Sequence, residues 1–264
     1  MYGRGGGGGS FRGGLGGGLG LPPLTPTVKK IIIACVVIAL AQWMLLDDDE
    51  IGPGGASLTW WLSISAYGVS DGNVQFMLLP WQFATYMWLH GDLGHLLFNM
   101  LGLYFLGGDL ERLWGARRFF QFYLTTGIGA GVVIWIWDVL WGSASSTLGA
   151  SGAIFGVLTA FSVIYADRQI MLMFPPIPMR AIFLLPVAFG FTLVFGWNAN
   201  VSHIGHLGGV LVALYLIKGD ANLGFAIGGL GSRWHRYRMR KRLRAVRREE
   251  WERRRDENDR HNIH

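Results

Sequence analysis

The sequence predicts an all-α fold: a polytopic membrane protein whose six transmembrane helices form one bundle. Of the 264 residues, 51% are hydrophobic and 15% charged, with a mean hydropathy of +0.34, which is unlike the composition of a soluble enzyme. Lys and Arg also fall in alternate connections between apolar stretches. Six such stretches, close to the roughly 17 to 25 residues that cross a hydrocarbon core, are almost free of charge: 31–46, 82–106, 119–137, 149–166, 179–196 and 201–217.

The distribution of Lys and Arg predicts the orientation of these spans, because both residues are retained on the cytoplasmic side. They occur before span one, between spans two and three, between four and five, and after span six. The other three connections, 47–81, 138–148 and 197–200, contain none. Both ends of the chain are therefore expected in the cytoplasm. The pair Trp60 and Trp61 in the first outward connection is expected to anchor it at the membrane interface.

The two ends differ in composition from the membrane domain, which is expected at 29–218. Residues 1–28 form a Gly-rich segment that predicts a flexible leader without a cleavage site, so span one remains as an anchor. Residues 219–264 form a basic tail, which from Arg233 onward holds 13 Lys and Arg against 6 Asp and Glu. Contact with anionic lipid headgroups is favoured for the tail over nucleic-acid binding. Cys35 is the single cysteine, so no intrachain disulfide is possible.

Polar side chains inside the predicted spans indicate function, because they are costly in hydrocarbon and usually face the interior of a bundle. Spans two, four and six all run inward, so their first turns share one depth. The polar residues and the glycines beside them lie in these three spans: His90, His95 and Asn99 in span two; Ser151 with Gly149, Gly152 and Gly156 in span four; His203 and His206 with Gly205, Gly208 and Gly209 in span six.

Small residues at a spacing of four predict that spans four and six pack closely. The pairs Gly152 with Gly156 and Gly205 with Gly209 allow two backbones to approach each other in lipid. Such an approach brings Ser151 to a histidine of span six.

A serine beside a histidine indicates nucleophilic catalysis, since an imidazole is the usual base that takes the hydroxyl proton. No Asp or Glu lies at this depth in spans four or six, so a dyad of Ser151 and His206 is expected rather than a triad. His203 remains an alternative base. His95 and Asn99, together with the Ser151 backbone N–H at a helix N-terminus, suit the stabilisation of an oxyanion.

The chain resembles the rhomboid family of intramembrane serine proteases over about 29–218. Three segments carry the resemblance, "HGDLGHLLFN", "GASG" and "GHLGG", and "ERLWG" after span two matches more loosely. The resemblance implies that Ser151 is the nucleophile and His206 the base, with His95 and Asn99 as oxyanion stabilisers. It implies a structural role for His90.

Other positions near the site are also placed by the resemblance. Some family members carry a Tyr that packs on the catalytic histidine where this chain has Phe155, which keeps the stacking surface and lacks the hydroxyl. Gly149, Gly152 and Gly209 are expected to be structural. Alignment of "HLGG" favours His206 over His203 as the base.

The function implied is hydrolysis of peptide bonds in or next to transmembrane segments, without a cofactor or metal. The expected partners are transmembrane protein substrates and the lipid bilayer, and no nucleic acid. Substrates would enter laterally, with span five as the gate, because it follows "FPPIP" and contains Pro186, which weakens a helix. A multi-pass location in a bacterial inner membrane is expected.

Two functions from other classes are the alternatives. One is a catalytically inactive relative that binds membrane substrates, although the presence of both Ser151 and His206 disfavours it. The other is a metal or haem protein, because imidazole is a common ligand; its ligands would be His90, His95, His203 and His206.

Overall fold

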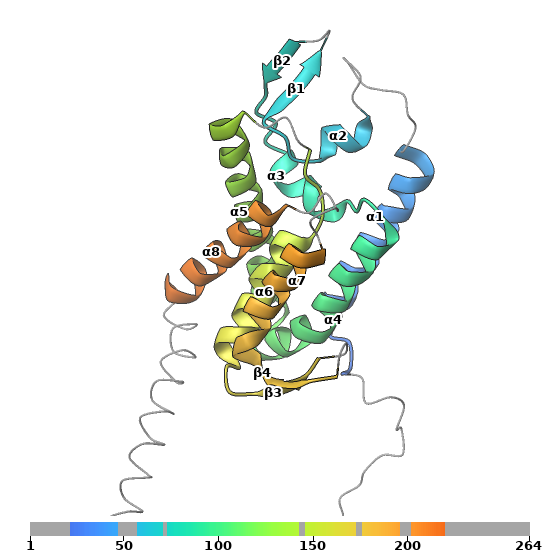
Figure 1. Cartoon of the computed structure of the whole chain (residues 1–264). Helices are drawn as coiled ribbons and strands as arrows, with labels where there is room; N and C mark the ends of the chain where they lie inside the picture. The colour runs from blue at the N-terminus through green and yellow to red at the C-terminus, as the bar shows by residue number, and fades with distance from the viewer. Residues whose placement is uncertain are drawn as a thin grey trace, which may run out of the picture.

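Six helices of twelve or more residues form a bundle in the described part of the chain (Figure 1). The computed structural model describes residues 22–46, 57–70, 73–142, 146–172, 176–195 and 202–219. Twelve of the fourteen residues of α6 are buried, because α4, α5 and α8 all pack against it. The helices are α1 (Pro26–Ala41), α4 (Leu93–Trp114), α5 (Ala116–Trp141), α6 (Ser151–Ile164), α7 (Leu184–Phe195) and α8 (His203–Gly219).

Short elements lie at both ends of this bundle (Figure 1). We call the end where α4, α6 and α8 begin the upper end, and the end where α1 and α5 begin the lower end. The lower end carries an antiparallel hairpin of β3 (Gln169–Met171) and β4 (Pro178–Arg180), followed by η3 (Ala181–Phe183). The upper end carries η1 (Gln42–Leu46), α2 (Leu58–Leu62), α3 (Gln82–Thr85), η2 (Tyr86–Trp88) and the antiparallel hairpin of β1 (Tyr67–Ser70) and β2 (Asn73–Phe76).

Each predicted span overlaps one helix of the bundle, but the helix boundaries differ most in span two. Residues 82–92 form two short turns and a loop, and α4 begins only at Leu93. The reason is the Asp92 side chain, which accepts a hydrogen bond from the His95 backbone N–H at 2.8 Å and so caps the helix. His90 therefore lies before the helix and not on it.

Two helical stretches of the described residues, Pro26–Met44 and Ala116–Trp141, are long and apolar enough to cross a membrane by length and composition. Three shorter apolar helices, of 10 to 17 residues, span Ser151–Ile164, Ala181–Val194 and His203–Gly219. The number of six crossings therefore stays a prediction. Residues 1–21 of the predicted leader and 220–264 of the predicted tail lie outside the described residues. Helix α1 already begins at Pro26, within the segment 1–28, and α8 ends at Gly219, the first residue of the predicted tail.

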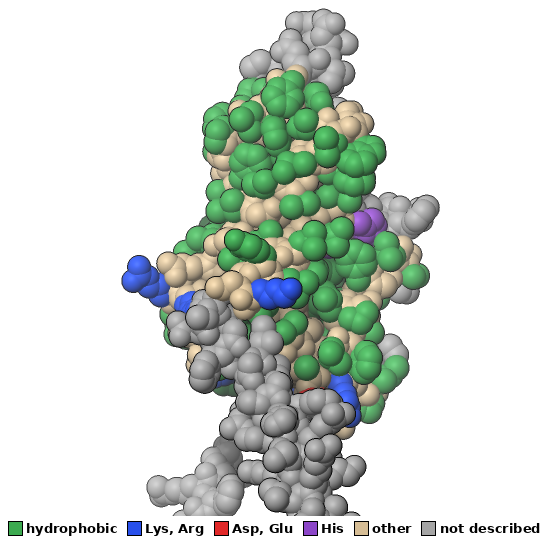
Figure 2. All heavy atoms as spheres, turned by 90° about the vertical axis from the view of Figure 1, so that its left-hand side faces the viewer, with side chains coloured by type: hydrophobic (Ala, Val, Ile, Leu, Met, Phe, Trp, Pro, Cys, Tyr) green, Lys and Arg blue, Asp and Glu red, His purple; other side chains and the backbone are tan. Residues whose placement is uncertain are grey.

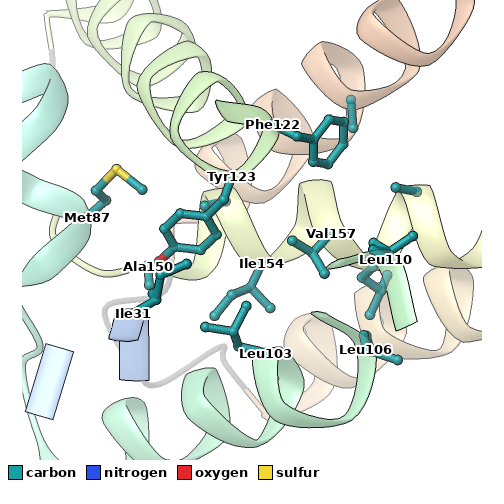
Figure 3. Close-up of a cluster of buried hydrophobic side chains, with 14 of the residues drawn as sticks. Ile31, Met87, Leu103, Leu106, Leu110, Phe122, Tyr123, Ala150, Ile154 and Val157 are labelled. Atoms are coloured by element: carbon teal, nitrogen blue, oxygen red, sulfur yellow. The ribbon is translucent and has the colours of Figure 1, made fainter. Parts of the chain in front are cut away.

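A hydrophobic core joins α1, α4, α5 and α6 (Figure 3). Its side chains interlock around α6, which fixes the position of the start of that helix. The residues of this core include Ile31, Leu103, Leu106, Leu110, Phe122, Tyr123, Ala150, Ile154 and Val157.

The outer surface of the bundle is also apolar. On α5 alone, Ile128, Val132, Ile136 and Leu140 are between 37% and 68% exposed, which is the pattern of a helix that faces lipid. Figure 2 shows hydrophobic side chains over most of one face of the described surface, with Lys and Arg only in its lower half.

A carboxylate at the lower end caps α1. Glu111, near the end of α4, accepts hydrogen bonds from the Thr25 hydroxyl at 2.5 Å and from the backbone N–H groups of Thr27 and Val28 at 2.9 and 3.0 Å. These N–H groups have no partner within the helix, and the negative charge suits the positive end of the helix dipole. Burial raises the pKa of Glu111, but these hydrogen bonds outweigh it and hold the pKa below its usual value.

We expect Glu111→Gln to destabilise the protein by about 2 kcal/mol at neutral pH, because hydrogen bonds to a charged group are lost. Because the pKa of Glu111 is lower in the folded protein than in the unfolded chain, the charged carboxylate stabilises wild type at pH values above its usual pKa. This stabilisation is lost as the pH falls through the lower pKa of the folded protein. Melting temperatures in detergent should therefore converge at acid pH. Asp167→Asn, at a side chain 82% exposed at the same end, is the control. Equal effects of both substitutions would contradict this assignment.

Candidate active site

Ser151 is the first residue of α6 and follows a strongly constrained turn. Gly149 has a φ of +123°, which residues with a side chain rarely adopt, and its N–H donates to the Tyr86 carbonyl at 2.9 Å. Two residues earlier, Thr147 and Ile64 exchange both backbone hydrogen bonds at 2.8 Å. The segment before Ser151 is thus fixed on both sides, and Ser151 itself is half-buried.

The backbones of α6 and α8 touch beside Ser151. A Cβ atom added to Gly209 would lie only 2.0 Å from the Gly152 carbonyl oxygen, and one added to Gly152 would lie 3.4 Å from the Gly205 carbonyl oxygen. Gly152 directly follows Ser151, and Gly205 directly precedes His206. This contact therefore places the two helix segments that carry the predicted dyad side by side.

Gly156 does not take part in that contact. A Cβ atom added there would lie 2.7 Å from Thr126 of α5, so the second glycine of the predicted pair in span four faces a different helix. The reason is that α6 is surrounded, and its small residues serve more than one neighbour.

His206 is buried, with 3% of its surface exposed, and its ring stacks on Phe155. The ring centroids are 4.1 Å apart and the planes differ by 12°. Phe155 lies four residues after Ser151, so both occupy one face of α6. The Phe155 ring thus holds the imidazole of His206 against the face of α6 that carries Ser151.

His95 and Asn99 approach the same place from α4. A Cβ atom added to Gly149 would lie 2.5 Å from His95 Cε1 and 2.6 Å from His95 Nε2, so this imidazole lies against the turn before Ser151. Asn99 is one turn further along α4 and is buried; its Nδ2 has no hydrogen-bond partner among the described residues. Two groups able to donate hydrogen bonds therefore lie on the side of α4 that faces the start of α6.

His90 connects η1, which follows α1, to the segment just before α4. Its backbone N–H donates to the Gln42 side chain at 3.0 Å, and its carbonyl accepts from Trp43 Nε1 at 3.0 Å. The ring lies edge to face against His95 at 5.3 Å between centroids. These contacts place His90 behind His95, where it supports the His95 ring.

His203 is the first residue of α8 and is half-buried. Its ring centroid lies 6.2 Å from that of His206, at 83° between planes. Of the two histidines on α8, only His206 stacks on Phe155 in the described contacts.

Tyr86 supports the site although the sequence analysis did not single it out. It is 1% exposed, its hydroxyl donates to the Gly127 carbonyl at 2.7 Å, and its own carbonyl holds Gly149. In the sequence it is one of many aromatic residues in an apolar stretch, so no local pattern distinguishes it.

Metal ligation has no support in the described part of the chain. No group of three or more His, Cys, Asp or Glu side chains there is placed to hold a metal ion. The four histidines weighed as ligands instead pack in pairs, His90 against His95 and His203 against His206.

Known proteins are similar to this chain over the part that carries the site. The family model described as the Rhomboid domain matches residues 79–220. The chain is 30% identical to the rhomboid protease GluP of Bacillus subtilis (strain 168) over 187 residues, which are 70% of this chain and 33% of that protein. It is 30% identical to the rhomboid protease AarA of Providencia stuartii over 149 residues, 50% of this chain and 53% of that one.

A mitochondrial relative is also similar. Rhomboid protein 1 of Saccharomyces cerevisiae (strain ATCC 204508 / S288c) is 36% identical over 138 residues, 49% of this chain and 40% of that protein. The matches thus span between about a third and a half of the length of these curated relatives.

Proposed function

The chain belongs to the rhomboid family of integral membrane proteins, and we propose that it is an intramembrane serine endopeptidase with a dyad of Ser151 and His206. One observation carries the proposal: the His206 ring is stacked on Phe155, one helical turn from Ser151. An imidazole so placed suits a base that activates the serine hydroxyl. The similarity to rhomboid proteases named as such adds support.

Acylation of Ser151 begins the proposed reaction. His206 Nε2 takes the hydroxyl proton while Ser151 Oγ attacks the carbonyl carbon of the scissile peptide bond. When the C–N bond breaks, the imidazolium returns the proton to the leaving amine, and an ester on Ser151 remains. Water then attacks this ester and passes a proton to His206. Return of that proton to Ser151 Oγ releases the new carboxylate.

The oxyanion of each tetrahedral intermediate needs donors that are already in place. The Ser151 backbone N–H lies at the start of α6, where the helix dipole favours negative charge. The His95 imidazole lies against Gly149, and the Asn99 amide is one turn away on α4. We assign these three groups to the oxyanion.

Hydrolysis within a transmembrane segment is tested by cleaving a reconstituted single-span substrate in water enriched in ¹⁸O. We expect one ¹⁸O atom in the new carboxyl group, at a bond in or next to the span. Binding of the substrate without cleavage would favour the inactive relative instead.

Entry of the substrate is assigned to the side of α7. No described residue of α7 is buried, and Val187, Phe191 and Val194 are between 41% and 70% exposed. Its upper half meets α4 through Phe98 and Phe191, whose ring centroids are 6.4 Å apart. Its Phe189 lies edge to face on Phe155, so outward movement of α7 uncovers the ring on which His206 stacks.

The lower end of α7 is held more firmly. Asp109 of α4 forms ion pairs with Arg112 and Arg168. The Arg168 carbonyl accepts a hydrogen bond from the Ala181 N–H at 2.9 Å, just before α7. We therefore propose that α7 swings at its upper end.

We expect a disulfide between Phe98→Cys and Phe191→Cys, in a Cys35→Ala background, to block cleavage of a transmembrane substrate at least about tenfold. Reduction should restore cleavage, because the link only prevents α4 and α7 from separating. The measurement is substrate cleavage in proteoliposomes before and after dithiothreitol, with each single Cys variant as a control. Unchanged cleavage in the fully linked protein would show that α7 is not the gate.

The membrane orientation remains the one expected from Lys and Arg. We propose that the lower end faces the cytoplasm and that the location is a bacterial inner membrane. Support comes from the position of Lys29, Arg117 and Arg168 at that end. Relatives include a mitochondrial protein, so protease accessibility of tags at both ends in bacterial spheroplasts is the appropriate test.

A further inference from the structure

Two imidazoles of α8 lie edge to face, and the same nitrogen of each ring has no hydrogen-bond partner among the described residues. His203 Nδ1 and His206 Nδ1 are both buried, and neither has a hydrogen-bond partner among the described residues. The two residues lie three apart on the helix, one turn from each other on one face. Their ring centroids are 6.2 Å apart.

The second nitrogen of a catalytic imidazole needs a hydrogen-bond partner that holds it in place. For Nε2 to act as the base, the proton of neutral His206 must lie on Nδ1, and an acceptor there fixes both this tautomer and the ring orientation. In a triad a carboxylate is that acceptor. The proposed dyad has no carboxylate assigned to this position.

The elements packed against this end of α8 offer few titratable groups. Neither α6 nor α7 contains a titratable side chain. His95 lies on α4, and the Tyr86 hydroxyl already donates to Gly127. On α5, Asp138 lies one turn beyond Ile134, which faces Gly205, and it makes interactions of its own.

We propose that His203 is the positioning residue of the catalytic histidine. One water bridges the two rings. It accepts a hydrogen bond from His206 Nδ1–H and donates one to Nδ1 of the neutral His203 imidazole. The ring separation puts the two nitrogens beyond direct hydrogen-bond reach, and such a gap is commonly bridged by one water. This inference rests on the proposed function, since it concerns the same base.

The test compares wild type with His203→Leu and His203→Asn in the full chain, purified in detergent. The labelling rate with a fluorophosphonate probe is measured, together with kcat and KM for a transmembrane substrate. We expect Leu to lower kcat and the labelling rate about 10- to 100-fold with KM unchanged, as for residues that orient a functional histidine. The Asn amide oxygen accepts a hydrogen bond and does not titrate. His203→Asn should therefore recover activity to within about threefold.

The outcomes separate this inference from the proposed function. Labelling of His203→Leu at the wild-type rate would overturn the role of His203 while leaving the dyad intact. Equal losses in His203→Leu and His203→Asn would also overturn that role, and labelling of His206→Ala would then show whether His203 is the base instead. Wild type that labels no faster than Ser151→Ala would overturn both. If His203→Leu proves unstable by its melting temperature, His203→Ala takes its place: a fall in kcat with KM unchanged supports the role, and a wild-type kcat refutes it.

Discussion

Ser151→Ala and His206→Ala are each expected to reduce cleavage of a transmembrane substrate by at least about 10³-fold, because a nucleophile and its base act as one unit. The double variant should be no worse than either single one, for the same reason. Initial cleavage rates in proteoliposomes measure this. His90→Asn is an informative comparison, since it changes a supporting side chain that lies behind His95, and a smaller loss is expected there.

The pattern of these losses matters more than their size. If His206→Ala retained most of the activity while His203→Ala lost it, the base would be His203, the alternative that the sequence left open. Multiplicative losses in the double variant would indicate that Ser151 and His206 act in separate steps, against a dyad.

Gly209→Ala should have the second largest effect. Its new methyl group would lie 2.0 Å from the Gly152 carbonyl oxygen, so α6 and α8 must separate. Overpacking of this kind costs about 1 to 3 kcal/mol, and a displacement of about 1 Å at reacting groups can cost about 100-fold in rate. Cleavage rate and melting temperature should both fall.

Gly219→Ala is the matched control for Gly209→Ala. It lies on the same helix, and nothing lies within 4 Å of a Cβ atom added there. The same substitution should leave activity and melting temperature nearly unchanged. Wild-type activity in Gly209→Ala would show that the close contact of α6 with α8 does not position the dyad.

Short motifs predicted where these residues lie on their helices better than they predicted the path of the chain. The spacing of His95 and Asn99, and the small residues around Ser151 and His206, depend only on helix geometry, which is local. Ser151 at the start of α6 and the ring of Phe155 on His206 are both where those patterns suggest. The chemical roles of these residues remain proposals.

The parts that could not be predicted depend on local capping and on packing between helices. His90 seemed to lie on a helix because residues 82–106 are apolar, but Asp92 starts α4 only at Leu93. The contact of Phe98 with Phe191 joins helices far apart in sequence. No periodic pattern within either helix specifies this contact.

The hairpin of β1 and β2 was missed for a different reason. The strands are only four residues each, too short for a clear alternation. The Asp-Gly pair that separates them in the sequence is a strong hairpin signal, and it was available. A hydropathy window of about 19 residues averages such short signals away.

Covalent labelling of the folded, purified protein with a fluorophosphonate serine probe tests the central claim most directly, because it requires no knowledge of the natural substrate. Mass spectrometry of the labelled protein should place the adduct on Ser151, and His206→Ala should abolish it. An unlabelled wild type that also leaves an unstable transmembrane substrate intact would contradict the protease assignment and favour a membrane protein that binds its substrates without cleaving them.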